Sequence, residues 1–303
     1  MTANFKDFHI SVPMIEFIDE FFEKTQKDFP DCIYSIKTNR SDFDSMTCGL
    51  ETGLTVIAGR PSMGKTSFSL SIAIENSILN QKKCIFFSLE SSKEAIFKKT
   101  ISYVAGIDLL RIYAARVTEQ HLERILESIV PIRDSNLYII DSVYTVDGIE
   151  SKVDEAGFMP DLIVVDSLQM LENHNPKTTR YRNLNEIILR LKRLSFKNKC
   201  PVILTSQLHK RLEMRADKRP VCSDFSESEF PAQAADKIIF MYRDDVYNEN
   251  TPDKSIVEVI CAKNKSGPIG KVSLNWIPQT GSYKDFVWKK SECSTRNVKC
   301  QKQ

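Results

Sequence analysis

Short apolar runs alternate with amphipathic stretches through the first two thirds of the chain. The runs are rich in β-branched and aromatic residues and predict strands at Leu54–Ala58, Cys84–Ser88, Leu137–Asp141, Leu162–Asp166 and Pro201–Ser206. The stretches between them have helical character. Such alternation predicts an α/β fold in which a mostly parallel sheet is covered by helices on both faces.

The last third of the chain has a different pattern. Strands are predicted at Ile238–Tyr242, Ser255–Ala262 and Lys271–Trp276, and turns rich in Asn, Asp, Gly and Pro separate them. Because short turns join neighbouring antiparallel strands, we expect these strands to extend one side of the sheet in a partly antiparallel manner.

The two ends of the chain differ from this α/β region. Within residues 1–32, apolar residues recur at helical spacing and predict one amphipathic helix; they are Met14, Phe17, Ile18, Phe21 and Phe22. This segment is too short to be a domain, so the helix packs either on its own domain or on a neighbouring subunit. We assign residues 33–288 to one domain and expect the polar, basic residues 289–303 to be a disordered tail.

Composition narrows the class of protein. With 303 residues, 42% of them hydrophobic, the chain is long enough for a buried core. Its 42 basic and 40 acidic residues nearly cancel, so contacts with nucleic acid would need local basic clusters. The 8 cysteines form no C-x-x-C pair, which argues against a zinc knuckle, and no apolar run is long enough for a membrane span. We therefore expect a cytoplasmic protein without membrane partners.

One segment fits the spacing of a phosphate-binding P-loop. It follows the strand Leu54–Ala58 and precedes a helix predicted to begin near Gly64. In such a loop backbone N–H groups surround phosphate oxygens, Lys65 bridges the β- and γ-phosphates, and Thr66 ligates Mg²⁺. The predicted nucleotide-binding residues are Gly59, Arg60, Pro61, Ser62, Met63, Gly64, Lys65, Thr66 and Ser67.

Three further polar residues end predicted strands. Asp166 ends the apolar run Leu162–Asp166, as expected of a second Mg²⁺ ligand. Glu90 follows the strand after the P-loop helix and is the candidate base that activates water; alternatively, it is a glutamate favoured at a helix start. Gln207 follows Pro201–Ser206 and would sense the γ-phosphate, although a Gln at a strand end is often a capping or surface residue.

Together these segments resemble the successive motifs of DnaB-type replicative helicases. The resemblance covers roughly Ile33 to Phe286 and rests on Gly59–Thr66, Phe87–Glu90, Asp166 with Leu168 and Gln169, Ser206–Leu208, Arg215–Pro220 and Tyr242–Asp244. The block Arg215–Pro220 is more diagnostic than the P-loop. The family implies a RecA-like core, a hexameric ring, ATP and Mg²⁺ at subunit interfaces, and single-stranded DNA in the central channel. It also implies that the helix near residues 12–27 docks on the adjacent subunit.

Three departures from the family matter. Too few residues precede the predicted helix for the family's N-terminal collar, which puts partners such as a loader or a primase in question. The channel loop reads Ser226-Glu227-Ser228-Glu229 where the family has Arg-Glu-Ser-Gly, which should weaken DNA binding. The family's Lys-x-Arg finger, which reaches the neighbour's γ-phosphate, appears as Lys263-Asn264-Lys265, so turnover should be slower.

Other residues are candidates for DNA contact. Most of them follow either the predicted strand Leu162–Asp166 or Gln207. The predicted set is Arg180, Arg182, Lys210, Arg211 and, in the channel loop, Glu227, with Lys177 and His209 beside them. Solvated surface charge is the alternative interpretation.

Two other functions compete with a helicase motor. A RecA-like recombinase or clock-type ATPase would share the P-loop and the acidic residues, but it should lack the Arg215–Pro220 block. A partly degenerate DnaB-like protein that binds nucleotide and assembles, but unwinds poorly, is favoured by the altered channel loop and by Lys265.

Overall fold

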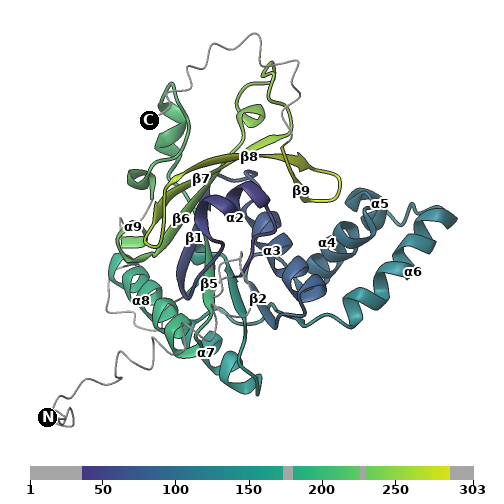
Figure 1. The fold of residues 1–303 in the computed structure, drawn as a ribbon, viewed down its shortest axis with the longest axis horizontal. Coiled ribbons are helices and arrows are strands. Elements are labelled where there is room, and N and C mark those ends of the chain that lie inside the picture. The colour runs from purple at the N-terminus through teal and green to yellow at the C-terminus, as the bar shows by residue number, and fades with distance from the viewer. Residues whose placement is uncertain (1–35, 173–179, 226–229, 287–303) are drawn as a thin grey trace, which may run out of the picture.

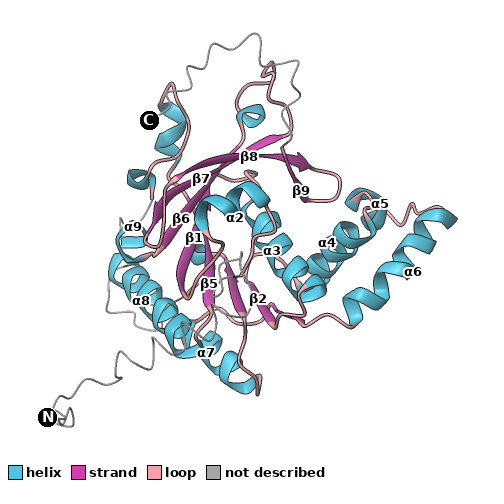
Figure 2. Cartoon of the chain, in the orientation of Figure 1, coloured by secondary structure: helices cyan, strands magenta, loops and turns pink. Residues whose placement is uncertain are grey.

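A computed structural model describes residues 36–172, 180–225 and 230–286, which form one nine-stranded sheet with helices on both faces (Figures 1 and 2). The predicted helix near residues 12–27 and the predicted tail at 289–303 lie outside the described residues. No helix in the described ranges is long and apolar enough to span a bilayer.

The strand order is β3-β2-β4-β5-β1-β6-β7-β8-β9. The first six strands in this order run parallel, and β7, β8 and β9 add to one side by antiparallel pairing. Their bounds are β1 Gly53–Gly59, β2 Cys84–Ser88, β3 Leu137–Ile140, β4 Leu162–Asp166, β5 Pro201–Gln207, β6 Lys237–Tyr242, β7 Ile256–Asn264, β8 Gly270–Ile277 and β9 Ser282–Asp285. The expected α/β architecture, mostly parallel with antiparallel strands near the C-terminus, is confirmed.

Helices cover the sheet on its two faces. Their bounds are α2 Ser41–Thr47, α3 Lys65–Leu79, α4 Lys93–Ala105, α5 Leu109–Tyr113, α6 Glu119–Arg133, α7 Val146–Glu155, α8 Arg180–Asn198 and α9 Phe230–Ala234. Successive strand residues point to opposite faces. Thus Ile57 packs into a core with α2, α3 and α4, whereas Val56 and Ala58 pack into a second core with α7 and α8.

The outer helices form a projection from this body. In Figure 1, α4, α5 and α6 extend to one side of the sheet, and α6 lies farthest out. Several large apolar side chains of α5 and α6 are exposed, including Leu110 at 75% and Leu126 at 57%. Since monomeric proteins rarely expose contiguous apolar surface, this projection has the character of an interaction surface.

Three local differences from the sequence expectations have physical causes. Strand β3 ends at Ile140 because the next residue, Asp141, leaves the ladder and accepts a hydrogen bond from Lys93 N at 2.7 Å. Strand β7 begins after Ser255, whose φ of 60° is incompatible with an extended strand. Strand β9 was not predicted, because its sequence Ser-Tyr-Lys-Asp has too little apolar content to indicate a strand.

Candidate nucleotide site and its surroundings

The P-loop joins the carboxyl end of β1 to the N-terminus of α3. Gly64 has φ 92°, a conformation that glycine adopts without strain, and α3 begins at the next residue, Lys65. The hydroxyl of Tyr283 in β9 donates to Gly64 O at 2.9 Å, and a Cβ on Gly64 would overlap with that hydroxyl. Both the turn and the close approach therefore require glycine here.

Two predicted metal ligands contact each other beside this loop. Thr66 Oγ1 donates to Asp166 Oδ2 at 2.8 Å, and Thr205 Oγ1 donates to the other carboxylate oxygen of Asp166. Asp166 is 1% exposed, and the two predicted ligands come from α3 and β4. Hydroxyl and carboxylate oxygens are the ligands that Mg²⁺ prefers, so this pair fits the ion implied by the family.

Lys65 lies in the same cluster. Its Nζ donates to Arg60 O at 3.1 Å, across the turn of the P-loop. Burial lowers the pKa of Lys65, while the charges of Asp166 and Glu90 partly offset that effect. Phosphate groups next to this ammonium would stabilise its charged form further.

Glu90 follows β2 at the same edge of the sheet. In the parallel register Ser88 lies opposite Asp166, and Leu89 N donates to Asp166 O at 2.6 Å. The side chain of Glu90 is exposed, and its charge acts on Lys65. Helix α4 starts later, with Ser92 as its N-cap and Glu94 as the acid of its first turn. Glu90 therefore lies outside that first turn, which removes the main support for reading it as a helix-start glutamate.

Gln207 ends β5 directly beside the P-loop. It is paired in register with Gly59, and its backbone N–H donates to Gln169 Oε1 at 3.0 Å. Gln169 also donates through Nε2 to Ser206 Oγ at 3.2 Å. Gln169 was part of a motif recognised in the sequence. Its hydrogen bonds to the end of β5 form because β4 and β5 are neighbours in the sheet.

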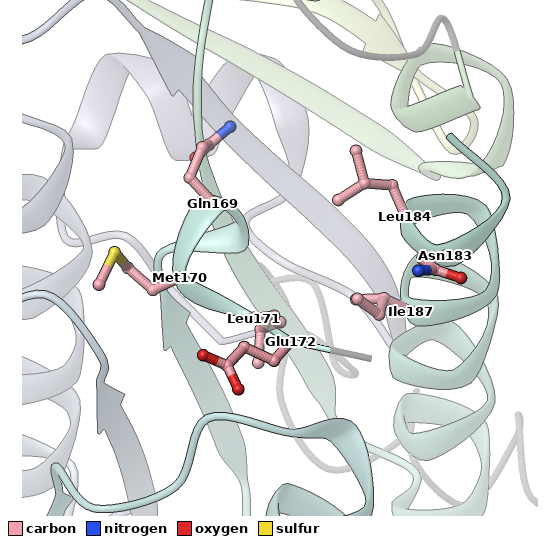
Figure 3. Close-up of a pocket in the computed structure, with 7 residues that line it drawn as sticks. All are labelled: Gln169, Met170, Leu171, Glu172, Asn183, Leu184 and Ile187. Carbon is pink, nitrogen blue, oxygen red and sulfur yellow. The ribbon is translucent and has the colours of Figure 1, made fainter. Parts of the chain in front are cut away.

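Gln169 also borders a cavity of about 410 Å³ between the short helix η2, Leu168–Met170, and the start of α8. Figure 3 shows the lining side chains on the two sides of this cavity: Gln169, Met170, Leu171 and Glu172 on one side, and Asn183, Leu184 and Ile187 of α8 on the other. The cavity therefore adjoins the end of β5 that carries Gln207.

The predicted DNA residues are only partly within the described ranges. Lys210 and Arg211 are exposed on the short helix η3, Lys210–Met214, shortly after Gln207. Arg182 is exposed on α8, beside Arg190 and Arg193. The side chain of Arg180 and the residues Lys177 and Glu227 lie outside what the structure describes, as does the whole altered loop at 226–229.

The predicted finger residues lie at the opposite edge of the sheet. Because β7 runs antiparallel to β6, its carboxyl end adjoins the start of β6. Lys265 Nζ contacts Asp236 Oδ1 at 2.8 Å, and Asp236 Oδ2 accepts from Leu54 N at 3.0 Å. Lys263 Nζ donates to two backbone carbonyls, those of Ala232 and Gln233.

This position keeps Lys265 away from the P-loop of its own chain. From Leu54 to Gly59 the strand β1 advances about 17 Å at the usual rise per residue. The lysine pair is thus separated from the cluster of Lys65, Thr66 and Asp166 by the length of a strand, which is more than a lysine side chain spans.

The diagnostic block Arg215–Pro220 forms an ion-pair network. Arg219 pairs with both carboxylate oxygens of Glu258 at 2.7 Å, and its guanidinium lies over the ring of Tyr242 at 4.9 Å. Arg215 pairs with Asp224 at 2.7 Å. This network attaches the segment after β5 to β6 and β7.

Three residues near the P-loop were not predicted as site residues: Arg243, Trp276 and Tyr283. Arg243 donates to Ser62 O at 3.2 Å and lies over the indole of Trp276, 5.9 Å from its centre. Trp276 in turn packs against Tyr283, with ring centres 4.7 Å apart. Arg243 was part of a quoted motif, but only the pairing of β8 and β9 beside α3 brings these aromatic residues to the nucleotide loop.

Comparison with known protein families gives one consistent result. Residues 35–285 match the family described as the DnaB-like helicase C-terminal domain. The replicative DNA helicase DnaB of Haemophilus influenzae is 36% identical over 267 residues, which cover 84% of this chain and 56% of the relative. DnaB of Buchnera aphidicola from Acyrthosiphon pisum is 35% identical over 272 residues, which cover 86% and 59%. The chain thus spans little more than half the length of these curated relatives.

Solved structures agree with these sequence matches. One structure, described as an ATPase domain, has a TM-score of 0.85 and 32% identity, covering 91% of this chain and 99% of that chain. A DnaB-like replicative helicase, described with its interactions with primase, has a TM-score of 0.82 and 32% identity, covering 91% of this chain and 67% of that chain. The RecA-like fold class and the resemblance inferred from sequence are confirmed.

Proposed function

The chain belongs to the DnaB-like helicase C-terminal domain family, and on that premise we propose that it is an ATP-hydrolysing helicase motor that translocates on single-stranded DNA. The contact of Thr66 with Asp166 beside Lys65 carries the proposal, because it joins the P-loop to the acidic strand end. This combination positions the phosphates of ATP and their metal ion in P-loop enzymes.

Each residue of the cluster has a proposed role. Lys65 neutralises the β- and γ-phosphates, and Thr66 and Asp166 hold Mg²⁺, which neutralises charge on the phosphate oxygens when bound. Glu90 accepts a proton from the attacking water, since its exposed carboxylate lies close enough for its charge to act on Lys65. Gln207 contacts the γ-phosphate from the neighbouring strand end. Lys263 and Lys265 act on the ATP of an adjacent subunit, because the length of a strand separates them from their own P-loop.

Single-stranded DNA is the proposed nucleic acid along which the motor moves. Lys210 and Arg211 are exposed on the segment that follows Gln207, so phosphate contacts there would lie close to the nucleotide sensor. Arg180, Arg182 and Glu227 complete the proposed DNA set. A replicative role suggests a cytoplasmic location and partners such as a loader or a primase.

Self-association as a ring, most simply a hexamer, is part of the proposal. The exposed apolar surface of α6 includes Leu122 at 50%, Leu126 at 57% and Val130 at 51%. These residues recur at helical spacing, so they form one stripe that would suit another amphipathic helix. The predicted helix near residues 12–27 of a neighbouring subunit is the proposed occupant.

Sedimentation tests this assembly. Leu126→Lys should shift the oligomer toward monomers, because it introduces a charge into the apolar stripe of α6. Glu127→Lys is the matched control, since its side chain is also exposed on α6 but is not part of the stripe. An oligomer that resists Leu126→Lys would show that α6 does not contribute to the interface.

The most direct test of the proposed activity compares ATP turnover with and without single-stranded DNA, together with the mass of the nucleotide-bound assembly. A motor should hydrolyse ATP faster with DNA and form a multimer. Nucleotide binding and assembly without DNA-stimulated turnover would favour the partly degenerate relative instead.

A further inference from the structure

The side chain of Arg60 contacts the segment that follows β5. Its Nε donates to Glu213 Oε1 at 2.8 Å, and its Nη1 donates to Leu208 O at 2.9 Å. The guanidinium is well covered, with 17% of the side chain exposed, and Glu213 is 29% exposed. A guanidinium that binds two acceptors in a partly buried site is held in one orientation.

The segment that Arg60 contacts is a closed loop, which we call the post-β5 loop, residues 208–225. Its two ends meet in an antiparallel bridge between Leu208 and Phe225, and His209 N donates to Asp224 O at 2.8 Å. Asp224 also accepts from Val221 N and pairs with Arg215. These bonds link the beginning, middle and end of the loop, so a displacement at Leu208 or Glu213 would be passed to its other residues.

The same residue is bonded to the phosphate-binding lysine through its backbone. Lys65 Nζ donates to Arg60 O, the carbonyl of the residue whose side chain contacts the post-β5 loop. Phosphate groups compete for that ammonium, because a charge-assisted hydrogen bond to phosphate is stronger than one to a neutral carbonyl. Occupancy of the P-loop would thus change the bonding of Arg60 itself.

We propose that Arg60 is a positioning residue that transmits nucleotide occupancy from Lys65 to the post-β5 loop through Leu208 O and Glu213. This inference rests on the proposed function, since it takes ATP as the ligand of the P-loop. This connection differs from the one proposed for Gln207, because it begins inside the P-loop and not at the end of β5. The exposed Lys210 and Arg211 lie on the loop that it would move.

Hydrogen exchange of the full chain tests the connection directly. The probe is a non-hydrolysable ATP analogue with Mg²⁺, and the readout is its effect on exchange in peptides from residues 208–225. In the parent protein the analogue should change exchange there. Glu213→Ala should bind the analogue with affinity within about twofold of the parent, but lose most of the change in the loop, since energetic coupling is a separate quantity from affinity.

Two further variants separate transmission from simple loss of structure. Glu213→Gln keeps an oxygen that can accept from Arg60 Nε, so it should restore the nucleotide-dependent exchange. Arg60→Lys keeps the charge but cannot reproduce the planar two-acceptor geometry, so it should weaken the response. Asp154→Ala is the matched control, because it removes an exposed ion pair with Lys197 at 2.7 Å on the distant pair α7 and α8.

DNA affinity provides the second readout. In the parent the analogue should alter the affinity for an oligonucleotide, and in Glu213→Ala that alteration should shrink about fivefold, within the usual range of coupling between two sites. If the parent does not bind the analogue, the proposed function fails, and the connection fails with it. If the parent binds it but the post-β5 loop does not respond, or Glu213→Ala responds like the parent, the connection is wrong while the proposed function stands.

Discussion

The two edges of the parallel strands carry the two sets of predicted catalytic residues in contrasting environments. At the carboxyl edge Asp166 is buried, Lys65 and Thr66 are half-buried, and all three are bonded to one another or to the P-loop. At the amino edge Lys265 is 52% exposed and pairs with Asp236, which Lys192 also contacts at 2.7 Å. One edge is arranged to receive a ligand, whereas the other presents cations at the surface.

The two edges would act together only across a subunit interface. The carboxyl edge contains, within one chain, the groups that we propose for binding phosphate and metal and for activating water, so its function is testable on single variants. The amino edge has no phosphate-binding loop beside it in the described residues, so its lysines contribute to hydrolysis only if a second subunit brings its own carboxyl edge close.

Lys65→Ala should have the largest effect. Removing the ammonium should weaken ATP binding about 10³-fold, because losing one partner of a buried charge pair typically costs several kcal/mol. The fold should persist, since burial already disfavours the charged lysine. Calorimetry measures the affinity for ATP, and circular dichroism measures whether the fold persists. An unchanged affinity would rule out this P-loop as the nucleotide site.

Glu90→Gln should preserve ATP binding and reduce turnover about 10²–10³-fold, within the usual contribution of a general base. The amide is close in shape to the carboxylate but cannot accept the proton. Turnover is measured under saturating ATP, with Glu94→Gln as the control, because Glu94 belongs to the first turn of α4. Near-normal hydrolysis in Glu90→Gln would place the base elsewhere.

Lys265→Ala should reduce DNA-stimulated turnover about tenfold, and Lys265→Arg should raise it by a similar factor. A guanidinium can hold two γ-phosphate oxygens, and tenfold corresponds to only ~1.4 kcal/mol. Mixing Lys265→Ala with Glu90→Gln subunits should restore part of the activity, because some interfaces then combine an intact Glu90 with an intact Lys265. Equal rates in the parent and both Lys265 variants would remove the finger from the mechanism.

Asp236→Asn should have the smallest effect, on stability more than on chemistry. Burial opposes the charged form, but hydrogen bonds from Lys192, Lys265 and Leu54 N outweigh it and hold the pKa of Asp236 below its ordinary value of 3.8. The carboxylate therefore contributes stability above that value and loses it as the pH falls further.

The asparagine variant should thus be less stable than the parent near neutral pH, by about 1 kcal/mol, and the difference should diminish in acid. Thermal unfolding at several pH values measures it. A difference that grows as the pH falls would contradict this account of the amino edge.

Most of the fold could be predicted from the sequence, because buried parallel strands appear there as continuous apolar runs. Leu162–Asp166 and Cys84–Ser88 were predicted with the bounds that the structure has. The P-loop was recognisable because its chemistry depends on residue type and spacing alone. Strand β9 was not, since a short polar segment becomes a strand only through its pairing with β8.

The direction in which a side chain points also could not be predicted from the sequence. Arg60 was predicted as a nucleotide-binding residue from its place in the P-loop, yet its guanidinium contacts Leu208 and Glu213. The opposite placement of Lys265 follows from the antiparallel direction of β7, which is a property of the sheet.

The contact between Tyr283 and Gly64 also has a consequence for biosynthesis. The two residues are 219 positions apart, so a ribosome makes the P-loop long before the tyrosine that bonds to it. Domains fold as units during synthesis, and contacts of such long range form late. A nascent chain released before β9 would therefore have every residue of the P-loop and still lack the hydrogen bond from Tyr283 to Gly64 O. If this bond holds the loop in shape, tight nucleotide binding should begin only after translation has passed β9.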